Sequence, residues 1–298
     1  MTMGRGGEPV GMQFTIIGAG KVGTALAVLL SRAGYEFVGA VSRSYESARR
    51  ACGCAGMGRA SADASALTRR AQIVFITTPD DAIADVCAGL AKAGAFARGA
   101  VVAHCSGALP SSILEPARGC GAHVGSMHPL QSFATAEQAA ELLPGSFCCI
   151  EGDPEAVAAL DAAALAVGAR VMHIPTENKA LYHASAVAAC NFLVALESAA
   201  LRMAEAAGIP REQALEALLP LVKGTVSNIE AVGIPQALTG PIARGDVETV
   251  RRHVEALRES LPALLPLYKA LALETVEVAL AKGTLEDGQA QDLRRLLS

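Results

Sequence analysis

The chain has 298 residues, of which 52% are hydrophobic and 18% are charged, and its formal net charge is −4 at pH 7. The length favours about two domains, and the apolar fraction is large enough to bury a substantial core. The small negative charge and the lack of a long basic run argue against nucleic acid as a main partner. No apolar stretch reaches the ~20 residues of a membrane span without interruption.

The first eleven residues are glycine-rich and polar. They lack the apolar segment of a secretory signal, so we expect a disordered leader at residues 1–11. The eight cysteines include no C-x-x-C pair, which favours reduced thiols in a cytoplasmic protein. Cys120 and His123 have the spacing of metal ligands, but no second compact pair accompanies them, so we expect no metal site.

The first half of the chain alternates between strand and helix patterns. Apolar runs typical of buried strands occur at residues 14–17, 36–41, 73–77, 100–104, 123–127, 147–151 and 170–174. Helical patterns lie between them, at residues 23–33, 45–52, 81–91 and 154–167. Strands this apolar, separated by helices, predict an α/β fold in which a doubly wound parallel sheet is covered on both faces.

A glycine-rich turn stands directly after the first apolar run. Its residues are Gly18, Ala19, Gly20, Lys21, Val22 and Gly23. In a strand–turn–helix context, G-x-G-x-x-G allows a tight turn, a close approach to a pyrophosphate and close packing of helix on strand. The start of the helix then faces the phosphates with its backbone N–H groups. The turn therefore predicts a dinucleotide site at these six residues.

The end of the second predicted strand bears on the choice of nucleotide. An NAD site usually places an acid there, whereas this segment reads Ser42, Arg43, Ser44. Arg43 could pair with a 2′-phosphate, and the two serines could donate hydrogen bonds to it. An ordinary polar loop is the alternative. The missing acid and the arginine together favour NADP(H).

The second half changes character near Pro175. We find no strand pattern after this point, and helices are predicted at residues 177–207, 211–232, 247–258, 262–282 and 287–297. The predicted domains are therefore a nucleotide-binding domain at residues 12–174 and an all-α domain at residues 175–298. Such a long first helix would span a domain or subunit interface. The glycine-rich loop at 239–246 includes Arg244, which could bind an acidic substrate or a neighbouring subunit.

Polar residues follow three of the predicted strands. In an open parallel sheet, ligands bind beyond the carboxyl ends of the strands. Turn chemistry alone would also explain these residues. The residues concerned are Thr77, Thr78 and Pro79 after the third strand, His104 and Ser106 after the fourth, and His128 after the fifth.

The first helix of the second half opens with a polar face. Lys179 and His183 are four residues apart and share that face, and Asn191 lies two turns further on. A lysine or histidine can supply a proton during hydride transfer, and an asparagine amide can orient a substrate. A solvated polar face is the alternative, although a cation is electrostatically disfavoured near a helix start.

Together these motifs resemble the Rossmann-like NADP oxidoreductases that carry a C-terminal helical domain of unknown function. The resemblance covers nearly the whole chain from Met12 and rests on residues 17–23, 104–107, 128–133, 179–191 and 239–246. The architecture is also similar to that of pyrroline-carboxylate reductases, ketopantoate reductases and 6-phosphogluconate or β-hydroxyacid dehydrogenases. The resemblance implies a Rossmann domain, and a homodimer made through the helical domains.

One departure from these families concerns the substrate. In the β-hydroxyacid dehydrogenases, a lysine and an asparagine one helical turn apart serve the substrate. Lys179 matches that lysine, but His183 stands where the asparagine would be. The sequence therefore predicts an NADP(H)-dependent oxidoreductase that transfers a hydride to or from a small polar carbonyl, imine or hydroxy acid at the interdomain cleft. A nucleotide-binding sensor or interaction protein without turnover is the alternative.

We expect each candidate catalytic residue to have a particular role. Lys179 is expected to donate the proton or anchor the substrate, and His183 and His128 to act as acid or orienting groups. Asn191 and Ser106 would hold the substrate, with His104 nearby.

Overall fold

The computed structural model describes residues 11–298, so the predicted leader lies outside the described residues apart from Gly11. The chain divides into two compact units, one ending at Cys190 and the other comprising Asn191–Ser298. The first is an α/β unit and the second is helical, which confirms the predicted fold class.

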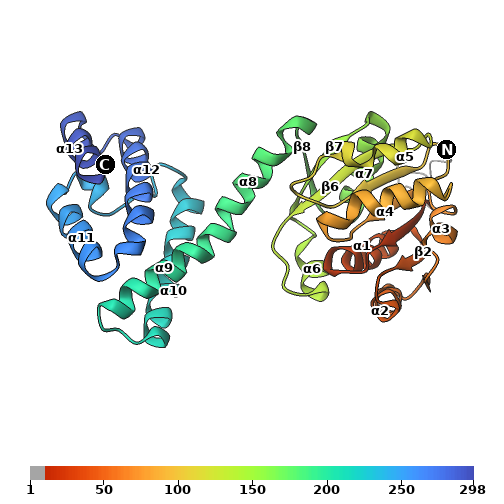
Figure 1. The fold of residues 1–298 in the computed structure, drawn as a ribbon, viewed down its shortest axis with the longest axis horizontal. Helices are drawn as coiled ribbons and strands as arrows, with labels where there is room; N and C mark the ends of the chain where they lie inside the picture. The colour runs from red at the N-terminus through yellow and green to blue at the C-terminus, as the bar shows by residue number, and fades with distance from the viewer. Residues whose placement is uncertain (1–10) are drawn as a thin grey trace. The chain divides into compact units, whose positions relative to one another are not determined.

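The first unit, coloured from red to green in Figure 1, is built on an 8-stranded sheet with the order β3-β2-β1-β4-β5-β6-β7-β8. Its strands are β1 (Gln13–Ile17), β2 (Glu36–Val41), β3 (Arg59–Ser61), β4 (Ile73–Ile76), β5 (Val101–His104), β6 (His123–Leu130), β7 (Phe147–Gly152) and β8 (Arg170–His173). Neighbouring strands are parallel except β6 and β7, which are antiparallel. The sheet is therefore mostly parallel, and the prediction of a parallel sheet was wrong only at this pair, because the buried residues of β7 resemble those of a parallel strand.

Helices cover both faces of this sheet. The helical elements of the sheet region are α1 (Lys21–Arg32), α2 (Tyr45–Ala55), α3 (Ala64–Thr68), α4 (Asp80–Lys92), η1 (Ser111–Leu114), α5 (Glu115–Gly119), α6 (Ala136–Leu142) and α7 (Pro154–Ala166). One buried cluster joins the sheet to α1, α2, α6 and α7, and a second joins the other face to α4, η1 and α5. Every residue of β4 is buried, as expected of a central parallel strand.

The helix predicted at residues 177–207 is interrupted. It begins as the short η2 (Thr176–Asn178), continues as α8 (Lys179–Ala189) and resumes as α9 (Asn191–Ala206) after Cys190, where φ is −114° and ψ is −65°. Helix α8 lies in the first unit, so the division of the chain falls later than the boundary predicted near Pro175. The physical reason is that Lys179, the first residue of α8, is buried against the sheet.

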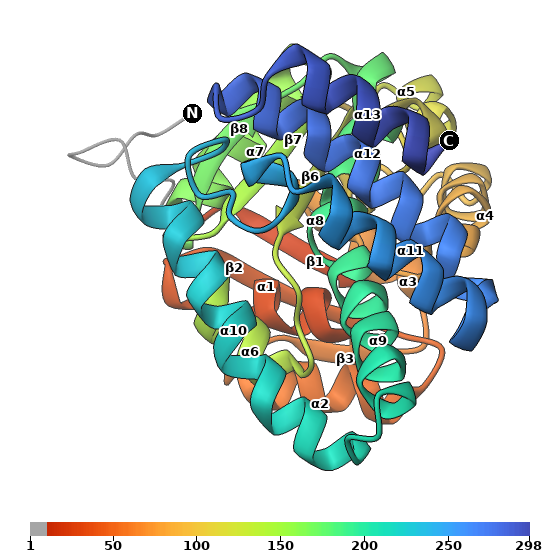
Figure 2. The same cartoon turned by 90° about the vertical axis from the view of Figure 1, so that its left-hand side faces the viewer.

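The second unit contains α9, α10 (Arg211–Val232), η3 (Ile242–Arg244), α11 (Val247–Ser260), η4 (Pro262–Leu264), α12 (Leu265–Lys282) and α13 (Asp287–Leu297). Helices α11, α12 and α13 form a small bundle with a core that includes Val254, Val276 and Leu293. Helices α9 and α10 form a helical hairpin whose two arms diverge from the connecting turn (Figure 2). Their buried residues are Ala199, Leu201 and Ala214.

The segment Thr176–Ala206 has the length and composition of a membrane-spanning helix, with a mean hydropathy of 1.6 over its most apolar window. Helices of soluble proteins also meet these two criteria, so the match is weak evidence for a membrane span. In this segment, 11% of that window is buried.

Candidate functional site

The glycine-rich turn joins β1 to α1 and packs against the end of β4. Gly18 has a φ of +109°, and a Cβ there would lie 2.6 Å from the backbone carbon of Thr77. The hydroxyl of Thr77 donates to the carbonyl of Gly18 at 2.6 Å. A Cβ on Gly23 would lie 2.4 Å from that same carbonyl oxygen. Gly18 and Gly23 are therefore required by the protein's own packing.

Gly20 differs from these two glycines. No heavy atom among the described residues lies within 4 Å of the position that a Cβ would take there. Gly20 is also the N-cap of α1 and offers no side chain to the N–H groups of the first turn. The helix start therefore presents backbone donors toward open space, which is the geometry of an anion site.

A cavity of about 330 Å³ adjoins this turn. It is lined by Ala19, Gly20, Lys21, Thr24, Ser47, Arg50, Ala136 and Glu137. Lys21 also donates through Nζ to the carbonyl of Phe133 at 3.1 Å, which ties the β6–α6 loop to the turn. The sequence reasoning missed Ser47 and Arg50, although their spacing of three on a predicted helix places them on one face.

The three residues predicted to read the nucleotide follow β2. Ser44 caps α2, because its hydroxyl accepts a hydrogen bond from the Ser47 N–H at 3.4 Å. Arg43 is exposed, and Ser42 is half-buried. Arg43 and Arg50 are thus two cations, one just before α2 and the other within it.

A second set of polar groups surrounds Gly107, in the loop after β5. A Cβ on Gly107 would lie 2.5 Å from Nδ1 of His183 and 2.8 Å from Nε2 of His128. The two imidazoles lie with their centroids 6.0 Å apart at 82°. The Nδ1 atom of His183 is buried and has no hydrogen-bond partner among the described residues. The structure therefore packs the imidazoles of His128 and His183 against one glycine. We call this group of three residues the Gly107 gap, because only a residue without a side chain fits between the two rings.

Burial determines the protonation state of the His128 imidazole. It lowers the pKa of this imidazole to about 4, assisted by the positive charge of Lys179 and by His183. His128 is therefore neutral near pH 7, and its Nδ1 lies 2.9 Å from the hydroxyl of Tyr182. A neutral imidazole can donate through one ring nitrogen while it accepts through the other.

Lys179 lies deeper than the Gly107 gap. Its side chain is 1% exposed, and Nζ donates to the hydroxyl of Ser126 at 2.6 Å. Nζ also lies 3.9 Å from Oε1 of Glu151. Glu151 accepts hydrogen bonds from the N–H and hydroxyl of Ser111 at 2.8 and 2.7 Å and from the hydroxyl of Thr176 at 2.8 Å. Lys179 is thus held inside a buried polar network that attaches α8 to β6 and β7.

His104 and Ser106 shape the loop that carries Gly107. His104 accepts a hydrogen bond at Nδ1 from the Ser106 N–H at 3.1 Å, and its Nε2 lies 3.2 Å from the carbonyl of Pro110. The Ser106 hydroxyl donates to Asp80 at 2.7 Å and accepts from the N–H groups of residues 108 and 109. These contacts occupy both ring nitrogens and the hydroxyl. The geometry thus gives both residues a place in the frame of the loop rather than at an open surface.

Contacts between loops connect the nucleotide turn to the Gly107 gap. Gly18 touches Thr77 at the end of β4, and Asp80, at the start of α4, touches Ser106. Thr78 lies between them, and its buried hydroxyl has no hydrogen-bond partner among the described residues. Pro79, the N-cap of α4, is exposed. The predicted strand-end residues therefore do meet along one edge of the sheet.

Three other candidates lie apart from these groups. Asn191 is exposed at the start of α9 in the second unit. The thiol of Cys120 donates to the carbonyl of Ala91 at 3.8 Å, and Nδ1 of His123 lies 3.4 Å from Glu155. Among residues 11–298, no group of three or more His, Cys, Asp or Glu side chains is arranged to hold a metal ion.

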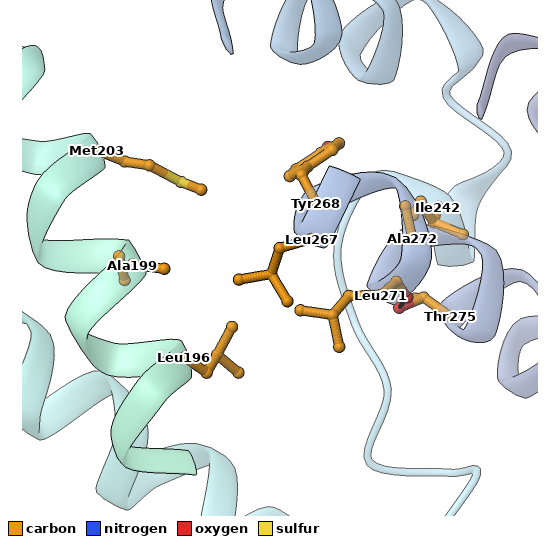
Figure 3. Close-up of a pocket in the computed structure, with 10 residues that line it drawn as sticks. Leu196, Ala199, Met203, Ile242, Leu267, Tyr268, Leu271, Ala272 and Thr275 are labelled. Carbon is orange, nitrogen blue, oxygen red and sulfur yellow. Dashed lines mark hydrogen bonds between the residues drawn. The ribbon is translucent and has the colours of Figure 1, made fainter. Parts of the chain in front are cut away.

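The second unit contains an apolar groove of about 260 Å³ between α9 and α12 (Figure 3). Leu196 and Met203 on α9 face Leu267, Tyr268 and Leu271 on α12 across it. Such a lining suits apolar side chains better than a small polar substrate. On the nearby η3 turn, Ile242 is buried while Arg244 is exposed.

Comparison with protein families finds two domain models along the chain, and the second begins within the sheet of the first unit, before Cys190. Residues 5–129 match the Rossmann-like domain, and residues 146–275 match a domain of unknown function (DUF2520). The chain thus combines the two domains that the sequence motifs predicted. No curated protein sequence matches the chain.

Solved structures extend this likeness over most of the chain. It is 29% identical to protein TM1727 from Thermotoga maritima, with a TM-score of 0.72 over 90% of this chain and 99% of that one. It is 26% identical to the "putative NADP oxidoreductase BF3122" from Bacteroides fragilis, with a TM-score of 0.69 over 90% and 98%. A pyrroline carboxylate reductase from Plasmodium falciparum, solved with NADP bound, shares the fold at 13% identity, with a TM-score of 0.56 over 98% and 99%.

Proposed function

We propose that this chain, which joins a Rossmann-like domain to a DUF2520 domain, is an NADP(H)-dependent oxidoreductase acting on a small polar carbonyl, imine or hydroxy acid. The observation that carries the proposal is the Gly107 gap, where two imidazoles converge on the sheet edge that also holds the nucleotide turn. The likeness over 90% of the chain to the protein titled "putative NADP oxidoreductase BF3122" supports the same interpretation.

The residues of the turn fit a dinucleotide. Gly20 leaves open space at the start of α1, and Lys21 and Arg50 supply positive charge beside it. The buried hydroxyl of Thr78, without a hydrogen-bond partner among the described residues, is a polar group that a bound cofactor would satisfy. When bound, the nicotinamide would supply or accept the hydride.

The chain's own residues would manage the proton. Reduction of a carbonyl or imine places a developing negative charge, or an unprotonated nitrogen, where a hydrogen-bond donor is needed. His128 and His183 face that position at the Gly107 gap, whereas Lys179 is buried behind them. We therefore assign proton handling to the two histidines, and we assign Lys179 to holding α8 in place.

The preference for NADP(H) over NAD(H) rests on charge. None of the three residues directly after β2, at positions 42–44, carries a carboxylate, whereas Arg43 is exposed there and Arg50 lines the cavity beside the turn. Two guanidinium groups suit a 2′-phosphate, with which each can form charge-assisted hydrogen bonds. The assignment of NADP(H) requires that at least one of the two arginines contacts the 2′-phosphate.

A fluorescence titration with NADPH and NADH tests the cofactor. We expect tighter binding of NADPH and a loss of that preference in Arg43→Glu and Arg50→Glu. Arg49→Glu is the matched control, because Arg49 pairs with Glu46 on the same helix and does not line the cavity. If neither nucleotide binds, the proposal fails.

Turnover is tested with a panel of keto acids, imines and hydroxy acids. We expect His183→Ala and His128→Ala to lower kcat by about 100-fold or more, as for the loss of a proton-transfer group. Tight NADPH binding with no turnover of any substrate class would instead favour the non-catalytic sensor.

We also propose that the protein is a cytoplasmic homodimer formed through the helical unit. The hairpin of α9 and α10 buries three residues but exposes large apolar side chains, among them Phe192, Val194, Leu221, Val226 and Val232. A second copy of the chain, rather than water, would cover such a face. All eight cysteines are unpaired, as in a reducing compartment.

Light scattering at several protein concentrations tests the dimer. We expect a molar mass of twice 30.4 kDa for the wild type. Leu221→Glu should shift this mass toward that of one chain, because it would bury a charge in the interface. Glu216→Gln, on the same helix, is a control for a change of charge outside the apolar face. A wild-type mass of 30.4 kDa would contradict the dimer.

A further inference from the structure

Tyr182 connects the Gly107 gap to the interior of the first unit. Its hydroxyl lies 2.9 Å from Nδ1 of His128, and the two rings meet edge to face at 81° with centroids 5.7 Å apart. The buried Cys149 lies opposite His128 in the pairing of β6 with β7. Tyr182 and His128 therefore form a hydrogen-bonded pair whose free end is Nε2 of His128, beside Gly107.

The pKa values of Tyr182 and Cys149 indicate which of their groups keep their protons, and so which atom donates to His128. Burial raises the pKa of Tyr182 and that of Cys149, so the phenol and the thiol both keep their protons near pH 7. An imidazole nitrogen is a far better acceptor than a thiol sulfur. The phenol therefore donates to Nδ1 of His128.

We propose that Tyr182 is a positioning residue that holds His128 in the tautomer with its proton on Nε2, so that His128 donates a hydrogen bond into the Gly107 gap and His183 exchanges the proton with the substrate. This inference rests on the proposed function. It follows because a neutral imidazole that accepts at Nδ1 carries its only proton on Nε2.

In this arrangement the two histidines have different roles, hydrogen-bond donation for His128 and proton exchange for His183. His128 can stabilise a carbonyl oxygen or an imine nitrogen through Nε2–H, but that nitrogen cannot accept a proton at the same time. His183 presents Nδ1, which is buried and has no hydrogen-bond partner among the described residues. In reduction, the substrate carbon would gain the hydride that a bound nicotinamide supplies, the substrate oxygen or nitrogen would gain a proton from His183, and solvent would return a proton to His183.

The tautomer is directly measurable by two-bond ¹H–¹⁵N NMR of the histidine rings in the whole protein. We expect the wild type to show His128 with a protonated Nε2 and an unprotonated Nδ1. Tyr182→Phe should lose this fixed state and give a mixture of tautomers. A wild-type His128 protonated at Nδ1, or already mixed, overturns the inference.

The chain offers a matched control. Tyr268 bonds to Nδ1 of His253 at the same 2.9 Å, also edge to face, but in the second unit. Tyr268→Phe should change the signals of His253 and leave those of His128 unchanged. Cys149→Ala should also leave the His128 tautomer unchanged, because Tyr182 donates to the imidazole. If Cys149→Ala gives a mixture of His128 tautomers, the assignment of Tyr182 as the hydrogen-bond donor to His128 is wrong.

A kinetic measurement separates this inference from the proposed function. With an active substrate, Tyr182→Phe should lower kcat by about tenfold or more while NADPH affinity stays within twofold, because a histidine in the wrong tautomer cannot serve the transition state. Unchanged kcat would overturn the role of Tyr182. Failure of the wild type to bind NADPH would instead overturn the oxidoreductase proposal and leave the NMR result standing.

Discussion

The ammonium of Lys179 donates to the hydroxyl of Ser126 at 2.6 Å, inside a network that excludes water almost completely. This contact joins the first residue of α8 to the middle of β6, and Glu151 on β7 supplies the opposing charge at 3.9 Å. Burial lowers the pKa of Lys179, and the Glu151 carboxylate opposes that effect. The Lys179–Glu151 pair therefore contributes to the stability of the first unit. It also fixes the position of His183, which lies one turn further along α8.

Removing this buried cation should destabilise the protein. We expect Lys179→Met to lower the free energy of unfolding by about 3–5 kcal/mol, because Glu151 would be left buried without its counter-charge. Urea denaturation of the first-unit transition measures the change. Lys92→Met, at an exposed helix end, should have little effect. Full stability in Lys179→Met, combined with lost turnover, would contradict the structural role and favour direct contact with substrate.

His104 should make stability depend on pH. Burial lowers its pKa from 6.5 to about 4, so the unfolded chain binds the proton more readily than the folded one. The stabilisation is complete above pH 6.5 and is lost as the pH falls toward 4; it amounts to about 3 kcal/mol. Thermal or urea unfolding between pH 4 and 7 should show a smaller loss in His104→Asn than in the wild type. The exposed His253→Asn is the control, and equal losses in all three proteins would contradict the assignment.

Gly107 should tolerate no side chain. In Gly107→Ala, the new Cβ would meet His183 at 2.5 Å and His128 at 2.8 Å, so at least one imidazole must move. We expect a loss of turnover of about 100-fold, because displaced donors no longer meet the reacting atom. Gly89→Ala on α4 meets no atom within 4 Å and serves as the control. Circular dichroism of both variants verifies the fold, and normal turnover in Gly107→Ala would place the reaction elsewhere.

The glycines of the nucleotide turn should separate into two classes. Gly18→Ala and Gly23→Ala should each lower the free energy of unfolding by about 2 kcal/mol or more, through backbone strain or overpacking. Gly20→Ala should fold normally, because its Cβ meets open space, but should weaken NADPH binding at least tenfold. Unfolding curves and the fluorescence titration measure the two effects independently. Equal binding by Gly20→Ala and the wild type would show that no ligand approaches this glycine.

Much of the fold was predictable because its signals are local. The order of elements in the first unit follows from apolar runs and turn residues, and α10 begins and ends at the predicted residues. The three residues of β3 escaped prediction, since a short edge strand carries little periodic signal. The strand β7 was predicted, but its antiparallel direction was not, because its buried residues resemble those of a parallel strand.

The candidate site was predicted only as a list of residues. Sequence spacing placed Lys179 and His183 on one helix face, and the structure agrees on that point. Spacing could not tell that one of the two is sealed behind Ser126 while the other reaches Gly107. Tyr182 was passed over, since an isolated tyrosine gives no signal until its partner His128 is brought beside it from 54 positions away.

The sequence by itself therefore determined the α/β class, the nucleotide turn and the helical second half, because each depends on residues close together along the chain. Tertiary structure alone decided which polar side chains are buried, which are paired and which converge on Gly107. Those properties depend on desolvation and on contacts between distant strands and helices. For that reason the two half-buried histidines, rather than the fully buried lysine, meet at Gly107.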